Sequence, residues 1–374
     1  MFSDAFARHG LLLRALLCRY PVMFCVFVFF LSRLFFWFLA FLGNAFFSLH
    51  LEPIAFFYHY DSVWYEGIAV HGYSSVANYA GHVNYVFFPL LPLIVGVLSA
   101  LTHISVIWMG QIFCQCCFGV ALWLFYQVLQ LRINENAARL GVLLLAFSPF
   151  NIYFSSFYTE SLFLVLSLGV WFAAYRGQWL VVGVLAALLS ATRPNGVMML
   201  VPLLYFIYQA FQNKALKPSM FFVALAPLGL LSYMLFLHIH FGGAFVFLHS
   251  EQVSWHRSGW VLAPAVFVSQ LLFNIMVFPY DTVVFLIAVF LIWSLLQKHY
   301  RSEALYFFMM LLPAVASGSF MSLGRFSGAL FAFYFALVLL LQERPYLKSL
   351  MFGLYFVFSI FYVFGWLCES SWLM

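Results

Sequence analysis

The chain has 374 residues, of which 66% are hydrophobic and only 7% are charged, and its formal net charge is +5. A soluble globular domain carries about 25% charged residues, so this composition excludes a protein whose main solvent is water. The basic residues are dispersed between apolar segments, which argues against a nucleic-acid partner. The apolar runs are continuous, as in 16–42 and 105–131, whereas strands of a membrane barrel would alternate apolar and polar residues. We therefore predict an all-α polytopic membrane protein.

The predicted spans follow from hydropathy and from the positions of basic residues. A spanning helix needs about 20 apolar residues, and Lys and Arg in short loops mark the cytoplasmic side. Arg8, Arg14 and Arg19 precede the first predicted span, near 20–43, and place the N-terminus inside. About eleven transmembrane helices result, near 20–43, 105–131, 138–153, 158–175, 178–192, 196–212, 219–240, 281–297, 303–318, 327–342 and 349–367.

Two further apolar stretches are predicted to lie on the outer membrane surface and not to cross it. The first, 86–101, is short and broken by Pro89 and Pro92, and the second is 263–278. Counting 86–101 as a span would place most later basic loops outside, against the usual distribution. With both stretches at the interface, all but four of the 16 basic residues fall on the cytoplasmic side.

The charges that this topology leaves unexplained gather at the outer face. Arg33 lies inside the first predicted span, whereas the other three exceptions, Arg193, Arg257 and Arg325, lie near the outer face. Two large outer loops, 44–104 and 241–280, also contain acidic residues. No repeat and no soluble domain is visible, so residues 1–374 are predicted to form one transmembrane domain with an extracytoplasmic site.

The first outer loop places a carboxylate among aromatic residues, in the stretch His59-Tyr60-Asp61-Ser62-Val63-Trp64-Tyr65. Aromatic, partly dry surroundings can raise a carboxylate's pKa and make it a competent general base. The alternative is a polar residue at headgroup level beside a belt of Trp and Tyr. Asp61 with His59 could also bind a divalent metal, although the predicted chemistry requires no metal and no other cofactor.

A second acid, Glu160, lies near the outer end of a predicted span, in Tyr158-Thr159-Glu160-Ser161. An acid within the membrane is costly and is by default a candidate functional residue. The alternative is a capping role, because Thr159 and Glu160 begin the predicted helix.

The three outer arginines lie in polar stretches: Thr192-Arg193-Pro194-Asn195-Gly196, Glu251-Gln252-Val253-Ser254-Trp255-His256-Arg257 and Ser322-Leu323-Gly324-Arg325-Phe326. A guanidinium suits bidentate binding of phosphate. A single arginine of this kind is commonly an interfacial anchor, but three with acids nearby favour an anionic ligand. The chain has no Walker A loop, no G-x-G-x-x-G and no Asp-x-Asp pair, so the energy for any reaction must arrive in a lipid-bound or exported donor.

The order of these motifs resembles the PIG-V family, which comprises GPI mannosyltransferase II and its bacterial relatives among the multi-spanning GT-C glycosyltransferases. The resemblance covers residues 30–260 by motif. It rests on Tyr60-Asp61, Tyr65, Ile68-Ala69 and Gly72-Tyr73, then Phe87-Phe88-Pro89-Leu90, Ser148-Pro149, Tyr158 to Phe163, Thr192 to Gly196, and Gln252, Trp255 and Arg257. The chain departs from the family pattern in having Tyr60 where Trp is usual, and it is shorter than the eukaryotic enzymes.

This resemblance implies a GT-C-like fold and a polyprenyl- or dolichyl-phosphate mannose donor used on the extracytoplasmic side, with a lipid-linked or glycan acceptor. Asp61 is then the expected catalytic base of an inverting transfer. Candidate residues for the donor phosphate and the substrates are Arg193, Arg257, Arg325, Tyr65, Glu160, Asn195, Gln252 and Trp255.

Two other classes of function compete with this hypothesis. A lipid or glycan transporter would carry paired broken helices in related halves and charges near mid-membrane, which the sequence does not display. A non-catalytic scaffold has no need for outer arginines beside a carboxylate. The absence of an N-x-[ST] sequon favours a bacterial cytoplasmic membrane over the endoplasmic reticulum.

Overall fold

The computed structural model describes residues 20–76, 82–255 and 264–370, and for 254–255 and 264–270 it describes only the backbone. Within these residues every regular element is a helix and no strand is present. The predicted all-α class is therefore confirmed. The α-helices are α2 (Pro21–Phe46), α3 (Asp61–His71), α4 (Leu90–Thr102), α5 (Val106–Arg132), α6 (Glu135–Ala146), α7 (Asn151–Ser155), α8 (Thr159–Tyr175), α9 (Trp179–Ser190), α10 (Leu200–Gln212), α11 (Leu228–Phe241), α12 (Val246–Trp255), α13 (Pro264–Val277), α14 (Pro279–Gln297), α15 (Arg301–Ala316), α16 (Leu323–Gly328), α17 (Phe331–Leu341) and α18 (Pro345–Leu367). Short 3₁₀ helices are η1 (Pro53–Phe57), η2 (Asn84–Val86), η3 (Pro194–Met199) and η4 (Pro218–Leu225).

Six helical segments in the described part of the chain are long and apolar enough to cross a membrane: Pro21–Phe46, Val106–Arg132, Pro194–Gln212, Pro218–Phe241, Pro279–Gln297 and Pro345–Leu367. The chain is therefore a helical, membrane-type protein. Each predicted span coincides with a helix or with two consecutive helices. However, α6, α9 and α17 have 12, 12 and 11 residues, fewer than the ~20 that a hydrocarbon core of about 30 Å requires. The count of about eleven spans stays a prediction.

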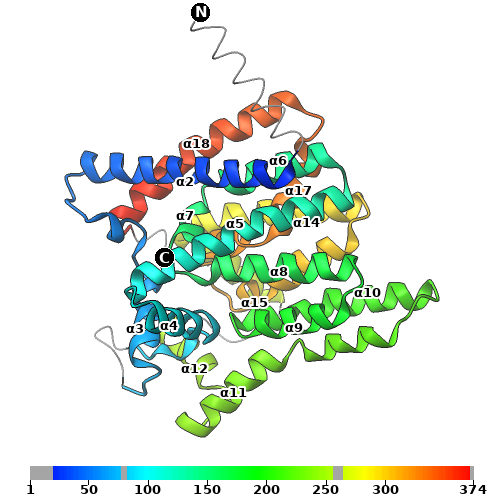
Figure 1. Ribbon diagram of the computed structural model, residues 1–374, viewed down its shortest axis with the longest axis horizontal. Helices are drawn as coiled ribbons and strands as arrows, with labels where there is room; N and C mark the ends of the chain where they lie inside the picture. Colours follow the sequence, from blue (N-terminus) through cyan, green and yellow to red (C-terminus); the bar gives the residue numbers. More distant parts are fainter. Residues whose placement is uncertain (1–19, 77–81, 256–263, 371–374) are drawn as a thin grey trace, which may run out of the picture.

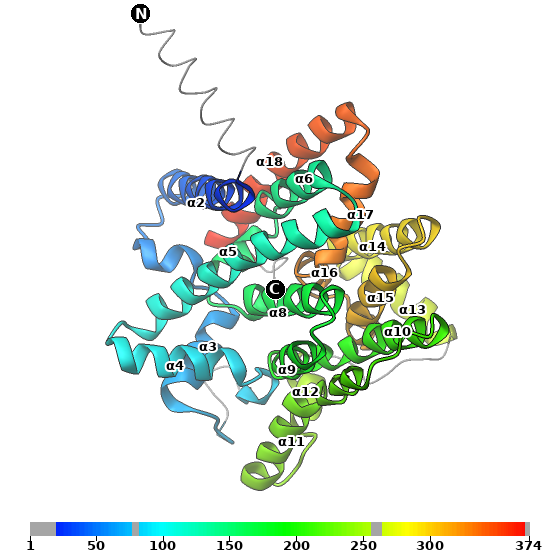
Figure 2. The same cartoon turned by 45° about the vertical axis from the view of Figure 1, so that its right-hand side comes forward.

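The longer helices lie side by side in a bundle, with α5 packed against α2, α6 and α8, and α8 packed against α9. Figures 1 and 2 show α3 and α4 together at the end of the bundle where α5 begins, and α4 contacts both α3 and α5. Helix α4 is the stretch predicted to lie at the outer membrane surface. The structure places α4 at one end of the bundle, and its location at the outer membrane surface stays a prediction.

Each end of the bundle holds its own group of ionised side chains. At one end Arg132, the last residue of α5, donates from Nε to Glu303 Oε1 at 2.9 Å, and the Tyr175 hydroxyl donates to the same oxygen at 2.8 Å. Helix α8 runs from Glu160 in its first turn to Tyr175 at this end. The predicted cytoplasmic residues around Arg132 and the predicted outer residue Glu160 thus lie at opposite ends of the bundle.

The chain between α6 and α8 is not one helix, as predicted for 138–153, but is interrupted at residues 147–150, where Pro149 disfavours helix for the preceding residue. Asn151 Nδ2 donates to the carbonyl oxygens of Leu145 and Ala146, at the end of α6, at 3.3 and 2.6 Å. From α2, Arg33 donates to Ser155 Oγ at 2.8 Å and to Asn151 Oδ1. This explains why a basic residue lies in the middle of the first predicted span, because the Arg33 guanidinium joins the polar groups that hold the break.

Two glycines allow α9 to pack closely against η4 and α11. A Cβ atom on Gly183 of α9 would lie 2.2 Å from the carbonyl oxygen of Phe222 in η4, and one on Gly229 of α11 would lie 2.1 Å from that of Ala187. Both distances are far below van der Waals contact, so these segments approach at a separation that no larger residue permits. Helix α9 is thereby fixed just before the loop that carries Arg193.

The opposite ends of the bundle can be assigned to the two sides of the membrane by cysteine labelling. We expect Ser75→Cys and Gln178→Cys, both at exposed positions, to react with an impermeant maleimide from opposite sides in a background without native cysteines. Only Ser75→Cys should label from the extracytoplasmic side, and permeabilisation should make both react. Labelling of both from the same side would overturn the predicted topology.

Candidate active site

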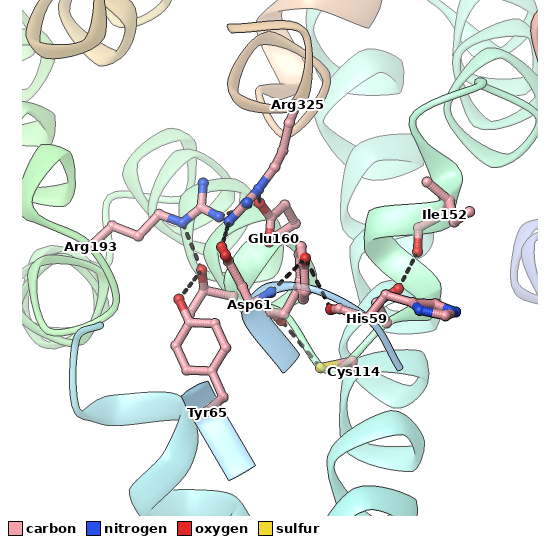
Figure 3. Close-up of polar contacts among 11 residues, drawn as sticks. His59, Asp61, Tyr65, Cys114, Ile152, Glu160, Arg193 and Arg325 are labelled. Carbon is pink, nitrogen blue, oxygen red and sulfur yellow. Dashed lines mark hydrogen bonds and ion pairs between the residues drawn. The ribbon is translucent and has the colours of Figure 1, made fainter. Parts of the chain in front are cut away.

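Four charged side chains from distant parts of the sequence meet at the end of the bundle opposite Arg132. Asp61 is the first residue of α3, Glu160 lies in the first turn of α8, Arg193 directly precedes η3, and Arg325 lies in α16. Figure 3 shows the two guanidinium groups directed toward the two carboxylates. We call these four residues the charged cluster.

Arg325 joins the two carboxylates. Its Nε donates to Glu160 Oε1 at 2.5 Å, and its second terminal nitrogen pairs with Asp61 Oδ2 at 2.6 Å. The guanidinium carbon also lies 4.6 Å from the centroid of the Tyr158 ring, within the range of a cation–π interaction. Burial on its own would lower the pKa of Arg325, but the carboxylates of Asp61 and Glu160 outweigh it and raise that pKa above its ordinary value.

Arg193 approaches Glu160 from the other side. One terminal nitrogen pairs with Glu160 Oε1, and Nε donates to Thr159 Oγ1 at 2.7 Å. The Thr159 hydroxyl lies 3.4 Å from the Tyr65 hydroxyl, so Tyr65 joins the cluster at its edge. Glu160 Oε1 therefore accepts from both arginines, while its Oε2 is buried without a hydrogen-bond partner among the described residues.

Burial differs sharply between the two acids. The Glu160 side chain is 1% exposed, whereas that of Asp61 is 23% exposed, and the two arginine side chains are 9% and 10% exposed. Two carboxylates and two guanidinium groups cancel in formal charge. The cluster is a neutral network in which Glu160 is enclosed and Asp61 is the member most accessible to solvent.

The backbone conformation around Tyr60 and its contact with Tyr158 fix the position of Asp61. Tyr60, the residue before α3, has φ +49, which is uncommon for an aromatic residue and is tolerated only where the surroundings hold it. The Asp61 N–H donates to the Tyr158 hydroxyl at 3.0 Å, and that hydroxyl donates to the His59 carbonyl at 3.3 Å. Tyr158 thus binds the first loop to the start of α8.

His59 is directed away from the charged cluster, as Figure 3 shows. Its Nδ1 lies 3.1 Å from Glu369 Oε1, near the end of the chain. Burial lowers the pKa of His59, and Glu369 partly opposes this shift. Among the described residues, no group of three His, Cys, Asp or Glu side chains is placed to hold a metal ion.

The structure brings together five of the residues predicted for the site: Asp61, Tyr65, Glu160, Arg193 and Arg325. Asn195 instead donates to the Met310 carbonyl at 3.2 Å and joins η3 to α15. Gln252 is exposed on α12. The side chain of Trp255 and the whole of Arg257 lie outside the described residues.

Sequence reasoning missed three residues that contact the predicted site residues or their neighbours: Tyr158, Thr159 and Glu369. Tyr158 and Thr159 lie in the stretch that singled out Glu160, but nothing in the sequence indicates that they contact Arg325 and Arg193. Glu369 lies 310 positions from its partner His59, and only the fold brings the two together. The sequence predicted that the outer arginines favour an anionic ligand. The structure adds that Arg193 and Arg325 already have carboxylate partners within the protein.

Comparison of the chain with protein-family models finds no match, and comparison with curated proteins finds no significant match. The resemblance to the PIG-V family therefore stays a hypothesis based on the motifs and their order.

The buried ion pairs predict a large stability difference between two Glu→Gln substitutions. Glu160→Gln deprives two buried guanidinium groups of an anionic partner, and breaking a buried pair costs about 3–5 kcal/mol. Glu135→Gln removes the exposed pair with Arg139, four residues along α6, which is worth about 0.3–0.5 kcal/mol. Unfolding in mixed micelles with increasing SDS should separate the two variants. Equal stabilities would show that Glu160 does not hold the cluster together.

Proposed function

We propose that the chain is a GT-C-type glycosyltransferase that moves a hexose, with mannose as the first candidate, from a polyprenyl- or dolichyl-phosphate donor to an acceptor hydroxyl. The observation that carries the proposal is the charged cluster, which combines a partly exposed carboxylate with two guanidinium groups at one end of an apolar helical bundle. The carboxylate is the group that a general base requires, and the guanidinium groups suit a phosphate leaving group. The motif order shared with the PIG-V family supports the same function.

The proposed reaction is a single displacement. The acceptor oxygen attacks the anomeric carbon, its proton passes to the Asp61 carboxylate, and the bond from the anomeric carbon to the phosphate oxygen breaks. The electron pair of that bond stays on the phosphate, whose growing negative charge the arginines stabilise. Attack opposite the leaving phosphate inverts the configuration at the anomeric carbon. No nucleotide and no metal take part in these steps.

Two features support an extracytoplasmic site. The cluster lies at the end of the bundle opposite Arg132, whose neighbours are the predicted cytoplasmic residues. It lies beside α3 and α4 in the first large loop, which the topology assigns to the outside. A polyprenyl-phosphate donor also suits a site at the membrane surface, because its isoprenoid can stay in lipid while its phosphate reaches the arginines. The proposed location is a bacterial cytoplasmic membrane with the site facing outward.

A transporter or flippase remains the second class of function. Transporters place coupling charges near mid-membrane, at discontinuous helices of two related halves. Here the ionised groups of the cluster gather at one end of the bundle, next to the surface helices α3 and α4. Arg33, in the middle of α2 beside the break between α6 and α7, is the feature closest to the transporter pattern, but its guanidinium is bonded to the polar groups of that break.

The proposed base can be tested with a near-isosteric substitution. Asp61→Asn cannot accept the acceptor proton, so we expect transfer to fall by about 10²–10⁴-fold. Purified protein would be incubated with radiolabelled polyprenyl-phosphate mannose and candidate lipid acceptors. Glu66→Gln is the matched control, since Glu66 is an acid of the same helix that accepts from the Tyr58 hydroxyl and pairs with no arginine of the described residues. Turnover of Asp61→Asn within about threefold of the parent would exclude Asp61 as the base.

Arg257 is proposed as a further ligand of the donor phosphate, on the strength of the Gln252, Trp255 and Arg257 motif. Lysine keeps the charge but loses the bidentate geometry, so Arg257→Lys should keep part of the activity and Arg257→Ala should lose far more. Arg176→Ala, at an exposed position on the opposite end of the bundle, serves as the control. If Arg257→Ala binds and turns over donor normally in detergent, Arg257 is a lipid-headgroup anchor and not a donor ligand.

A further inference from the structure

The edge of the Arg325 guanidinium formed by Nε and Nη2 is occupied by the two carboxylates of the charged cluster. Its Nε pairs with Glu160 and a terminal nitrogen pairs with Asp61, while its face lies on the Tyr158 ring. A phosphate that binds this edge of Arg325 replaces one of the two carboxylates, whereas a phosphate that binds elsewhere on Arg325 adds an anion to a network that is already neutral. Adding an unpaired anion to a partly buried site is costly, so replacement is the favoured route.

We propose that Asp61 occupies, in the donor-free protein, the place on Arg325 that the donor phosphate takes, so that phosphate binding releases the base. This inference rests on the proposed function for the identity of the ligand, a polyprenyl phosphate. The inference adds that the donor phosphate and the Asp61 carboxylate compete for the Arg325 guanidinium before both take part in the reaction.

The two acids differ in how readily they can leave Arg325. Glu160 is 1% exposed and accepts from both arginines, so its departure would leave two buried cations without this partner. Asp61 is 23% exposed, and within the described part of the chain its ion pair is with Arg325 alone. Rotation about its side-chain bonds can move the carboxylate toward solvent. Asp61 is the exchangeable partner and Glu160 the permanent one.

The exchange conserves the charge around the arginines. Before binding, Arg193 and Arg325 face Glu160 and Asp61. Afterwards they face Glu160 and the singly charged phosphodiester of the donor, while Asp61 regains water or meets the acceptor hydroxyl. After transfer the lipid phosphate is a monoester of higher negative charge, and the returning Asp61 would compete with it and assist its release.

The exchange also orders the reaction. While Asp61 is paired with Arg325, its Oδ2 is occupied and directed into the cluster, away from an acceptor. Only donor binding frees the carboxylate, and it does so beside the anomeric carbon that the donor brings. The proton acceptor therefore becomes available when both the sugar and the leaving group are in place.

Binding of a phosphate without a sugar tests the exchange apart from catalysis. Farnesyl phosphate would be titrated in detergent by isothermal calorimetry, with farnesol as the control for isoprenoid binding. Removal of the competing carboxylate in Asp61→Asn should tighten binding of farnesyl phosphate by at least about fivefold, the lower range of typical coupling between sites. Glu66→Gln removes the same charge from the same helix and should stay within about twofold of the parent, which separates specific competition from general attraction of anions.

Two further variants complete the test. Arg325→Gln should weaken binding, and Asp61→Asn combined with Arg325→Gln should lose the gain of Asp61→Asn. The proposal is overturned if Asp61→Asn binds no tighter than Glu66→Gln, if the gain survives in the double variant, or if farnesyl phosphate binds no better than farnesol. None of these readouts involves transfer, so tighter binding with no transferase activity would retain the exchange and reject the proposed function.

Discussion

The buried carboxylate of Glu160 is the contact on which the end of the bundle depends. It lies in the first turn of α8 and accepts from Arg193, which precedes η3, and from Arg325 in α16. These three segments have no continuous helix in common, and each begins or ends near this point. In lipid there is no general hydrophobic force between helices, so polar contacts of this kind decide which apolar surfaces meet. Glu160 supplies such a contact for three segments at once.

The same constraint explains the other buried polar groups near the interrupted helices. Where a helix stops inside an apolar bundle, its free backbone groups need partners. Asn274 donates to the Gly318 carbonyl at 3.0 Å and accepts from the Phe320 N–H at 2.7 Å, and Asp281 accepts from the Gly324 N–H at 2.7 Å. These bonds fix the loop that leads into α16. They hold Arg325 in reach of Glu160 much as Arg33 and Asn151 hold the break before α8.

Much of the helix content followed from the sequence, because lipid requires long apolar segments that hydropathy detects directly. Arg193 and Arg325 were also identified, since each violated the distribution of basic residues that the topology otherwise satisfied. The lengths of α6, α9 and α17 were less predictable, because breaks at positions such as Pro149 depend on tertiary partners. The pairing of Arg325 with Asp61 was beyond the sequence altogether, because it depends on how the fold places α16 beside the start of α3 and not on any local pattern.

A neutral cluster resolves a conflict between folding and binding an anion. Arginines that wait uncompensated for a phosphate would be costly to bury at the edge of an apolar bundle, whereas arginines fully enclosed by acids would be closed to it. Here one acid, Glu160, is enclosed and the other, Asp61, is partly exposed. In the exchange proposed above, the arginines stay compensated while the exposed partner is replaced. The unequal burial of two carboxylates on one guanidinium would then make a stable fold compatible with an anionic ligand, with Glu160 as the structural acid and Asp61 as the proposed base.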